Sequence, residues 1–508
     1  MADEDRIQSS KSITDDYLDG SLIKLKETQE EHFRDIQNIL ESNYAYVDTS
    51  PMGSGKTIIA LGTAGYWGFG IFVICPKSTQ SMWIKEAEKY GINVRGTMTY
   101  QKLTGTGTKG CSHGLLNRVN NDFSSTHELH KMIEEGTLFI FDEMHALKNP
   151  GTGAIKAAHS IVKEVVRMNA GSRVALLSAT PFDKENHAQN MLKMMGIITD
   201  DDLYYYDPSY NYYEPLGITE AIKYCDEHNR AVSEGIHIGI SISNKTCNKL
   251  CYDLLVNVVK AECFSSMDSP KILARKDAMN GYYWMPQNEV DELRAGVDLL
   301  SESTNYEDTT RTVNIGKGNF GMITTALIMI EKAKINTMIR LARETLESDP
   351  NCKVILYVWY IDSIKRMQGS LKEYNPMVMY GETKITQRDT IIENFQEDSN
   401  THRLLISNAK VGGIGISLDD RSGKHPRHLF MIPTYNFIDL HQATGRIHRT
   451  TTLSDAHIRF IYSKEFRNET SILNALARKS LVTKSVLFKD EGIVFPGEYE
   501  SYVEERNQ

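Results

Sequence analysis

The glycine-rich stretch SPMGSGKT, Ser50–Thr57, constrains the fold of this chain more than any other part of its sequence. It follows the apolar run YAYV and precedes IIALGTAG, which can begin a helix. A strand, a glycine-rich loop and a helix N-terminus in this order are what a phosphate-binding loop requires, because glycines let backbone N–H groups approach phosphate oxygens. Serine stands where the strict pattern begins with glycine, and a small residue still fits there. We therefore predict a nucleotide site formed by Gly53, Ser54, Gly55, Lys56 and Thr57.

Two side chains of this loop have expected tasks. Lys56 would reach the β- and γ-phosphates, and the Thr57 hydroxyl would hold Mg²⁺. The alternative, a glycine turn with a surface lysine, leaves the strand before it and the helix after it unexplained.

The run TLFIFDEMH places two adjacent carboxylates at the end of a strand. Residues 139–141 predict a buried strand, and Asp142 and Glu143 stand at its carboxyl end. Ligands of open α/β sheets bind at that end, so Asp142 can hold Mg²⁺ and Glu143 can orient and deprotonate an attacking water. Two solvated acids at a strand end are common and by themselves weak evidence for a site. A catalytic role for Asp142 and Glu143 is better supported because a phosphate-binding loop precedes them in the chain.

A third group of residues lies in HQATGRIHRTTT, His441–Thr452. Gln442, Arg446 and Arg449 are spaced four and then three residues apart, so on a helix they would share one face. Such a face suits an anion, and an arginine finger stabilises charge on a transferred γ-phosphate by about 10³–10⁵ in rate. An exposed basic helix face, the alternative, explains neither Gln442 nor the glycine at position 445.

The order of patterns along the chain predicts three parts. Short apolar runs followed by polar or glycine-bearing loops continue to about residue 181, which is typical of a parallel sheet with helices on both faces. Helix-like segments then fill residues 186–325, and a second α/β series comes after them. The expected limits are a flexible lead (1–20), a first α/β domain (21–185), a mainly helical insert (186–325), a second α/β domain (326–490) and a loosely held acidic tail (491–508).

Composition excludes some classes of protein. The net charge of −9 argues against a global basic field that holds nucleic acid, so any such contact must use a local groove. No apolar run reaches 18 residues, and the polar start MADEDRIQSS does not resemble a secretory signal. Seven cysteines without a framework suit a reducing compartment, so we expect an intracellular location: cytoplasm, nucleus or a virion.

Taken together, the motifs resemble those of superfamily 2 helicases and translocases, in the family's order over roughly residues 25–450. The stretch LKETQ resembles the Q-motif, with Gln29 as the adenine reader. SPMGSGKT resembles motif I, ICPKSTQSMW motif Ia, TYQKL motif Ib, DEMH the DExH form of motif II, and SATP motif III. VILYVWY lies where motif IV belongs, SNAKVGGIGISL resembles motif V, and QATGRIHR resembles motif VI. DEMHALKN, the tryptophan after CPKSTQSM and GGIGISL favour the Swi/Snf-like branch, and the ending GRIHRTTTLSDAHIRFIY resembles helicases of large DNA viruses and the strawberry-notch group.

The resemblance implies two RecA-like domains in tandem and hydrolysis of ATP with Mg²⁺ between them. It also implies nucleic acid as the partner, with DNA favoured over RNA. The contacts would come from motifs Ia, Ib, IV and V and would be independent of base sequence. Gly415 of motif V joins the expected nucleotide contacts, and the expected nucleic-acid contacts are Pro76, Lys77, Thr99, Thr383 and Ser407.

Other functions remain alternatives. A Swi/Snf-like duplex translocase would move without separating strands, and a nucleotide-dependent switch or small-molecule kinase would also own a phosphate-binding loop. Switches and kinases lack a second half with motifs V and VI. An inactive scaffold is the third class, against which the intact Lys56, Glu143 and Arg449 argue.

Two further patterns suggest binding but favour plainer interpretations. Six tyrosines lie close together in LYYYDPSYNYY, Leu203–Tyr213, and their rings could stack on unpaired bases. Alternatively, this segment or the insert could bind a protein partner. A loop docked by its rings is the interpretation we favour. Cys247 with Cys251, and Cys111–His113 with His127–His130, lack the spacing of a zinc site.

Overall fold

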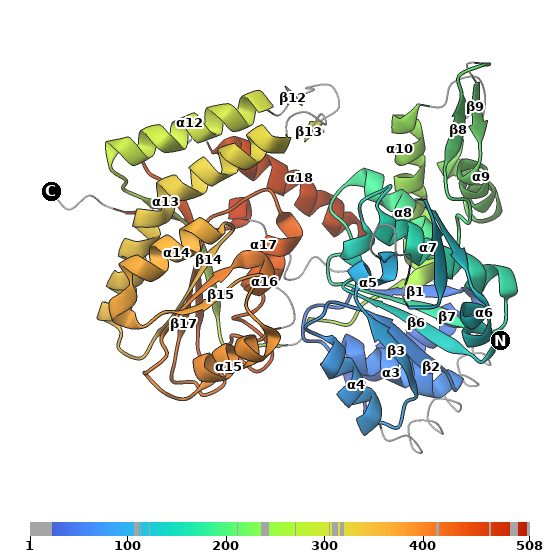
Figure 1. Ribbon diagram of the computed structural model, residues 1–508, viewed down its shortest axis with the longest axis horizontal. Coiled ribbons are helices and arrows are strands. Elements are labelled where there is room, and N and C mark those ends of the chain that lie inside the picture. The colour runs from blue at the N-terminus through green and yellow to red at the C-terminus, as the bar shows by residue number, and fades with distance from the viewer. Residues whose placement is uncertain are drawn as a thin grey trace. The chain divides into compact units, whose positions relative to one another are not determined.

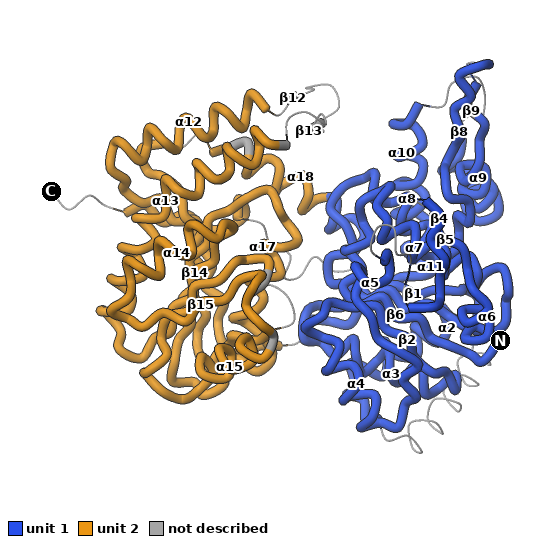
Figure 2. The backbone as a smooth tube through the Cα atoms, viewed as in Figure 1, with its two compact units in different colours: residues 1–269, 482–492 blue, residues 270–481, 493–508 orange. Residues whose placement is uncertain are grey.

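The chain divides into two compact units, which are shown in different colours in Figure 2. Unit 1 comprises Met1–Ser269 and Val482–Gly492, and unit 2 comprises Pro270–Leu481 and Ile493–Gln508. The computed structural model describes residues 23–105, 111, 113–120, 122–210, 212–234, 243–269, 271–303, 305–306, 313–314, 320–412, 416–466, 469–487 and 496–504.

Unit 1 is built on a six-stranded sheet in the order β10-β1-β7-β6-β2-β3, and every neighbouring pair in it is parallel. Its strands are β1 (Ala45–Asp48), β2 (Gly70–Ile74), β3 (Val94–Met98), β6 (Thr137–Asp142), β7 (Arg173–Leu177) and β10 (Phe264–Ser265). Two antiparallel hairpins accompany the sheet: β4 (Leu116–Val119) with β5 (Asp122–Ser125), and β8 (Tyr204–Asp207) with β9 (Tyr212–Pro215).

Both faces of this sheet are buried, because successive strand residues point to opposite sides. Val47 and Phe139 belong to one core cluster, whereas their neighbours Tyr46 and Ile140 belong to another. The second cluster contains residues of α2 (Glu27–Ser42), α3 (Lys56–Trp67) and α4 (Gln80–Lys89). The first contains residues of α5 (Tyr100–Thr104), α6 (His127–Glu134), α7 (Gly153–Met168), α8 (Ala188–Met194), α9 (Gly217–His228), α10 (Asn244–Leu254) and α11 (Lys260–Cys263).

Unit 2 repeats this plan with a seven-stranded parallel sheet in the order β15-β16-β14-β17-β18-β11-β19. Its strands are β11 (Lys276–Tyr283), β14 (Lys353–Val358), β15 (Met377–Met379), β16 (Leu404–Asn408), β17 (Arg427–Met431), β18 (Ala456–Ser463) and β19 (Ser501–Val503). The short strands β12 (Asn305–Tyr306) and β13 (Val313–Asn314) form a separate pair. Its helices are α12 (Gln287–Ser303), α13 (Phe320–Ser348), α14 (Ile361–Ser370), α15 (Ile385–Gln396), α16 (Ala409–Gly412), α17 (Phe437–Thr444) and α18 (Thr470–Val486), of which the last turn belongs to unit 1.

The expected fold class, two RecA-like parallel-sheet domains in tandem, is confirmed. The segment predicted as an insert, residues 186–325, is divided between the two units. Its strand β10 pairs with β1 in the first sheet, and its strand β11 pairs with β18 in the second. The compact units therefore differ from the expected domain limits, because two strands of this segment complete sheets whose other strands lie far away in the chain.

The acidic tail is not loosely held where the structure describes it, so that expectation was wrong for residues 496–504. Strand β19 pairs with β11 at the edge of the second sheet. The Glu504 carboxylate accepts hydrogen bonds from the Trp284 N–H at 2.8 Å and from Arg340 at 2.7 Å. A strand edge and an ion pair thus fix this end of the chain. Among the described residues, no helix is both long and apolar enough to cross a membrane.

Candidate nucleotide-binding site

The phosphate-binding loop has the predicted context of strand, loop and helix. It connects β1 to α3, whose first residue is Lys56. Gly53 and Gly55 adopt φ angles of +79° and +108°, a region that side chains disfavour. The Lys56 ammonium donates hydrogen bonds to the carbonyls of Ser50 at 2.7 Å and Pro51 at 3.1 Å. The cation is therefore held over the loop, where phosphate oxygens could replace these carbonyls as its partners.

Gln29 on α2 reaches the same loop. Its side-chain amide donates to the Ser54 carbonyl at 3.0 Å, and its side-chain oxygen accepts the Lys26 N–H at 3.0 Å. A Cβ atom at Gly55 would overlap the Gln29 amide nitrogen. The second glycine is thus needed for the approach of Gln29 as well as for its backbone angle, and the sequence motif indicates only the backbone requirement.

A buried network beneath the loop was also missed from the sequence. The Asp48 carboxylate, at the end of β1, accepts the Ser50 N–H at 2.9 Å and lies 3.2 Å from His32 Nε2. The other nitrogen of His32 lies 2.8 Å from the Ser265 hydroxyl, and the Ser50 hydroxyl accepts the Met267 N–H at 2.9 Å. The serine that departs from the strict motif therefore ties the loop to the chain just after strand β10, which no local pattern could reveal.

The electrostatics of this network favour an ionised Asp48. Burial alone would raise the pKa of Asp48, but His32, Lys56 and the Ser50 bonds outweigh burial and keep it below its usual value. The glycine-rich loop is thereby anchored to a charged carboxylate at the carboxyl end of β1.

Asp142 and Glu143 lie where the sequence placed them, at the carboxyl end of β6 in the same sheet. The Trp83 indole N–H donates to the Asp142 carboxylate at 2.9 Å, and the Tyr100 hydroxyl donates to the Asp142 carbonyl at 2.8 Å. Glu143 has a φ of +54°, which is uncommon for a residue with a side chain, and its carboxylate lies 3.3 Å from His145 Nδ1. The tryptophan was recognised in the sequence, but its hydrogen bond to Asp142 was not.

Burial and repulsion from Glu143 raise the pKa of Asp142 to about 6, although the bond from Trp83 and the charge of Lys56 oppose this. Two adjacent carboxylates that repel each other are a site that a cation would stabilise. A carboxylate such as that of Asp142 and a hydroxyl such as that of Thr57, at the start of α3, are the kinds of oxygen ligand that Mg²⁺ takes.

The predicted helix face of motif VI is wrong. Helix α17 ends at Thr444 with Gly445 as its C-cap, so only Gln442 is helical and the two arginines lie in the turn after it. Hydrogen bonds to residues of motif V hold this turn. The carbonyl of Arg446 accepts the Leu418 N–H at 2.9 Å, and the guanidinium of Arg446 donates to the Ile416 carbonyl at 3.4 Å. Tertiary hydrogen bonds, rather than helical periodicity, position these side chains.

Arg446 is buried and Arg449 is half-buried, and the two guanidiniums make this part of unit 2 electropositive. Gln442 and Arg446 are 3% and 4% exposed, and Arg449 donates to the Ser417 hydroxyl at 2.6 Å. Burial and the neighbouring Arg446 lower the pKa of Arg449 to about 10, so this guanidinium remains charged at neutral pH. Such a pair suits an anion. These residues belong to unit 2, whereas Lys56, Asp142 and Glu143 belong to unit 1. Gly415 lies outside the described residues.

The expected nucleic-acid contacts of unit 1 lie next to its sheet. Pro76 and Lys77 lie in the loop after β2, and Lys77 is exposed. The Pro76 carbonyl accepts the Thr79 N–H at 3.0 Å, and Thr99 caps α5 by accepting the Lys102 N–H at 3.1 Å. Hydrogen bonds thus order both loops, and an exposed cation stands on the first of them.

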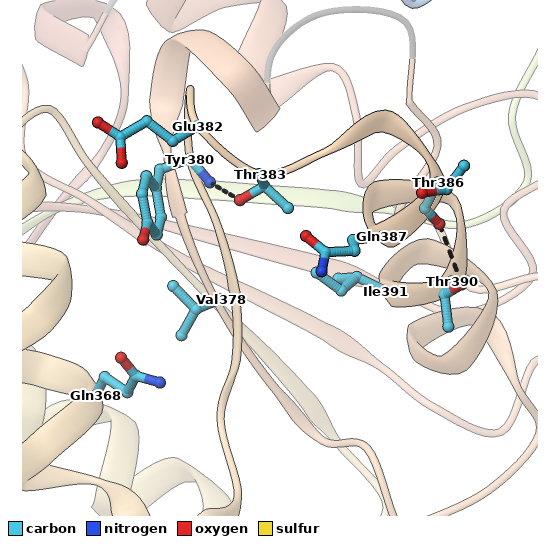
Figure 3. Close-up of a pocket in the computed structure, with 9 residues that line it drawn as sticks. All are labelled: Gln368, Val378, Tyr380, Glu382, Thr383, Thr386, Gln387, Thr390 and Ile391. Carbon is cyan, nitrogen blue, oxygen red and sulfur yellow. Dashed lines mark hydrogen bonds between the residues drawn. The ribbon is translucent and has the colours of Figure 1, made fainter.

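In unit 2, Thr383 lines a pocket of about 660 Å³ (Figure 3). The Thr383 hydroxyl accepts the Tyr380 N–H at 3.0 Å, and Arg388 donates to the carbonyls of Thr383 and Gly381. Ser407 is 0% exposed and its hydroxyl donates to the Asn408 carbonyl, so it was wrongly expected at a surface. The pocket is lined by uncharged side chains and one carboxylate: Gln368, Val378, Tyr380, Glu382, Thr383, Thr386, Gln387, Thr390 and Ile391.

The tyrosine-rich segment docks by its rings only in part, because Tyr204 packs against the core of unit 1 whereas other rings of the segment are exposed. Most of it forms the hairpin of β8 and β9, and Tyr205 and Tyr210 are 55% and 81% exposed. The cysteines Cys247 and Cys251 pack in the core on α10. His113 and His130 make separate contacts, with the Leu103 carbonyl and the Ser125 hydroxyl. Among the described residues, no three His, Cys, Asp or Glu side chains gather as a metal site.

Comparisons with known proteins show that this chain is similar to helicases. Residues 333–451 match the family model of the helicase conserved C-terminal domain. The protein L364 of Acanthamoeba polyphaga mimivirus, which is provisionally named an ATP-dependent RNA helicase, is 24% identical over 497 residues. That alignment covers 94% of this chain and 87% of the viral protein.

Two further matches concern Swi/Snf proteins. The SWI/SNF-related matrix-associated actin-dependent regulator of chromatin subfamily A-like protein 1 of Xenopus tropicalis is 32% identical over 133 residues, which are 26% of this chain and 13% of that protein. The solved SWI2/SNF2 ATPase core of Sulfolobus solfataricus in complex with dsDNA aligns with 93% of this chain and 97% of its own, at a TM-score of 0.31 and 16% identity. At that TM-score the structural similarity gives no support for a shared fold or function.

Proposed function

We propose that this chain is a Swi/Snf-like member of the superfamily 2 helicases and that it uses the hydrolysis of ATP to move along DNA. One observation carries the proposal. Lys56 and Thr57 begin α3 directly after the loop from β1, and Asp142 and Glu143 stand at the carboxyl end of β6 in the same parallel sheet. Phosphate ligands of α/β sheets bind at this edge.

The residues of unit 1 would divide the work at the phosphates. Lys56 would exchange its carbonyl partners for the β- and γ-phosphates, and Gln29 would contact adenine while it holds the Ser54 carbonyl. Thr57 and Asp142 would hold Mg²⁺, which supplies charge neutralisation at the phosphates. Glu143, whose carboxylate lies beside His145, would accept a proton from the attacking water.

The residues of unit 2 would sense the γ-phosphate. Arg446 and Arg449 carry charge that is poorly solvated, and a phosphate anion would stabilise both. Gln442 would orient the γ-phosphate or the attacking water, and Gly415 would add a contact to the nucleotide. Because the two sets belong to different units, hydrolysis would depend on both units acting on one nucleotide, which can convert chemistry into movement.

The residues proposed to contact the nucleic acid are Pro76, Lys77 and Thr99 in unit 1 and Thr383 in unit 2. Backbone groups, hydroxyls and one exposed cation suit phosphates, and such contacts carry no base sequence. DNA is proposed from the match to a Swi/Snf-related regulator of chromatin. The name of the viral relative supports RNA as the alternative polymer. The experiment below distinguishes movement along DNA from movement along RNA.

The test is steady-state ATP hydrolysis with no polymer, with single-stranded and duplex DNA, and with single-stranded and duplex RNA. Lys56→Ala is the inactive control, and Lys223→Ala, at an exposed lysine on α9, is the matched control expected to behave as the wild type. Stimulation by duplex DNA, without displacement of a labelled strand, would support a translocase that does not separate strands. Stimulation of ATP hydrolysis by RNA alone would refute the proposal that the protein moves along DNA. Hydrolysis indifferent to every polymer would refute movement along nucleic acid and favour a switch regulated by a protein partner.

A further inference from the structure

The hairpin of β8 and β9 presents a tyrosine-rich surface that the proposed ATPase site does not use. It projects from the body of unit 1 beside α9 (Figure 1). Tyr205, Tyr206, Tyr210 and Tyr212 are 55%, 41%, 81% and 43% exposed. Exposed aromatic rings in such number on one short hairpin mark a surface for binding rather than for packing.

Strand register assigns the residues of the hairpin to two faces. Tyr205 pairs with Glu214, and Asp207 pairs with Tyr212. Cross-strand partners share a face, and so do residues two apart on one strand. One face therefore carries Tyr205, Asp207, Tyr212 and Glu214, with the two rings on one diagonal and the two carboxylates on the other. We call these four residues the tyrosine–carboxylate face.

The charge of the hairpin argues against nucleic acid as its occupant. The hairpin, residues 204–215, carries two acidic residues, Asp207 and Glu214, and no lysine, arginine or histidine. Of the three aspartates that precede it, Asp201 is already paired with His159 and Lys163. A phosphate backbone would be repelled by this field, whereas a cationic partner would be attracted. Aromatic rings beside carboxylates are the combination that a guanidinium group recognises, because it can stack on a ring while it pairs with an acid.

The spacing matches an extended peptide. Diagonal neighbours on an antiparallel pair lie about 7–8 Å apart, and alternate side chains of an extended chain repeat at about 6.5–7 Å. A segment with arginine at alternate positions could thus place one guanidinium over Tyr205 and the next over Tyr212, each beside a carboxylate. We propose that the tyrosine–carboxylate face docks an extended, arginine-rich segment of a partner protein.

The proposal is tested with the full chain by fluorescence anisotropy. The probes are labelled peptides with alternating arginine and serine, lysine and serine, or glutamate and serine, and a single-stranded oligonucleotide. We expect the arginine peptide to bind more tightly than the lysine peptide, because lysine cannot stack as a plane. The glutamate peptide should not bind.

Two double variants and one matched control locate the binding. Tyr205→Ala with Tyr212→Ala, and Asp207→Asn with Glu214→Gln, should each weaken the arginine peptide by about tenfold, since each removes two modest contacts. Tyr210→Ala removes an exposed ring at the hairpin tip, outside this face, and should leave the affinity unchanged. All variants should keep wild-type ATP hydrolysis and melting temperature.

Three results would overturn the proposal. Equal affinity for the arginine peptide in the wild type and both double variants would place its binding elsewhere. Oligonucleotide binding that is lost with the two tyrosines and improved by neutralising the two acids would show that the hairpin stacks on bases. Self-association of the wild type, abolished in the tyrosine double variant and accompanied by no peptide binding, would identify the occupant as a second copy of this chain.

Discussion

Replacing Asp142 with asparagine should stabilise the protein while it abolishes ATP hydrolysis. Burial and the adjacent Glu143 raise the pKa of the Asp142 carboxyl from 3.8 to about 6. The folded protein therefore holds this proton more tightly than the unfolded chain does. Above pH 6 the carboxylate is ionised in both states, and its burial destabilises the fold by as much as about 3 kcal/mol. Asparagine keeps the shape and an acceptor for the Trp83 N–H, but it carries no charge.

The sign of the pH dependence is set by the raised pKa. Below about pH 4 the carboxyl is protonated in both the folded and the unfolded state, so the variant and the wild type should have equal stability. The advantage of asparagine should grow between about pH 4 and 6 and stay constant above. For a unit of this size, about 3 kcal/mol corresponds to an increase of roughly 5 °C in melting temperature.

The assay is thermal and denaturant unfolding of Asp142→Asn and wild type from pH 4 to 8, in EDTA and without nucleotide. Chelation matters because a bound cation would remove the repulsion between the two carboxylates. Asp202→Asn, at an exposed acid of the same unit, is the control and should change stability by less than about 0.5 kcal/mol. An Asp142→Asn variant that melts at or below the wild-type temperature at pH 7 would refute the reasoning, since the carboxylate would then not be a destabilising buried charge.

The same site and the C-terminal tail give three more expected outcomes. Glu143→Gln should lower ATP turnover at least about 100-fold while ATP binding, measured by calorimetry, stays intact, because the proposed proton acceptor is lost and Lys56 remains; full turnover would disprove that role. Trp83→Phe removes a hydrogen bond that lowers the pKa of Asp142. The acid limb of the rate–pH profile should therefore move to higher pH by about one unit. An acid limb at the wild-type pH would show that Asp142 does not govern this limb. Deleting residues 496–508 removes β19 and the Glu504 ion pair and should lower the melting temperature, whereas an unchanged melting curve would mean that the tail adds no stability.

The sequence alone was sufficient for the features that depend on neighbours in the chain. The glycines at 53 and 55, the lysine after them and the apolar run before them specify a loop between strand and helix, because backbone angles and helix starts are local properties. Asp142 and Glu143 come directly after a buried apolar run, and the carboxyl edge of a parallel sheet is where such residues must emerge. Two series of this kind predicted two parallel-sheet domains.

Only the tertiary structure decided which distant residues meet. Trp83 bonds to Asp142, and His32 joins Asp48 to Ser265, across separations that no spacing rule reports. Helical periodicity misplaced the arginines of motif VI, because Gly445 ends the helix and hydrogen bonds to residues 416–418 hold the turn that carries both guanidiniums. The segment 186–325 was expected to be a mainly helical insert, but strands on either side of residue 269 complete two sheets. Local patterns encode backbone conformation, whereas strand order and buried polar networks depend on which surfaces exclude water together, and that is settled only when the whole chain packs.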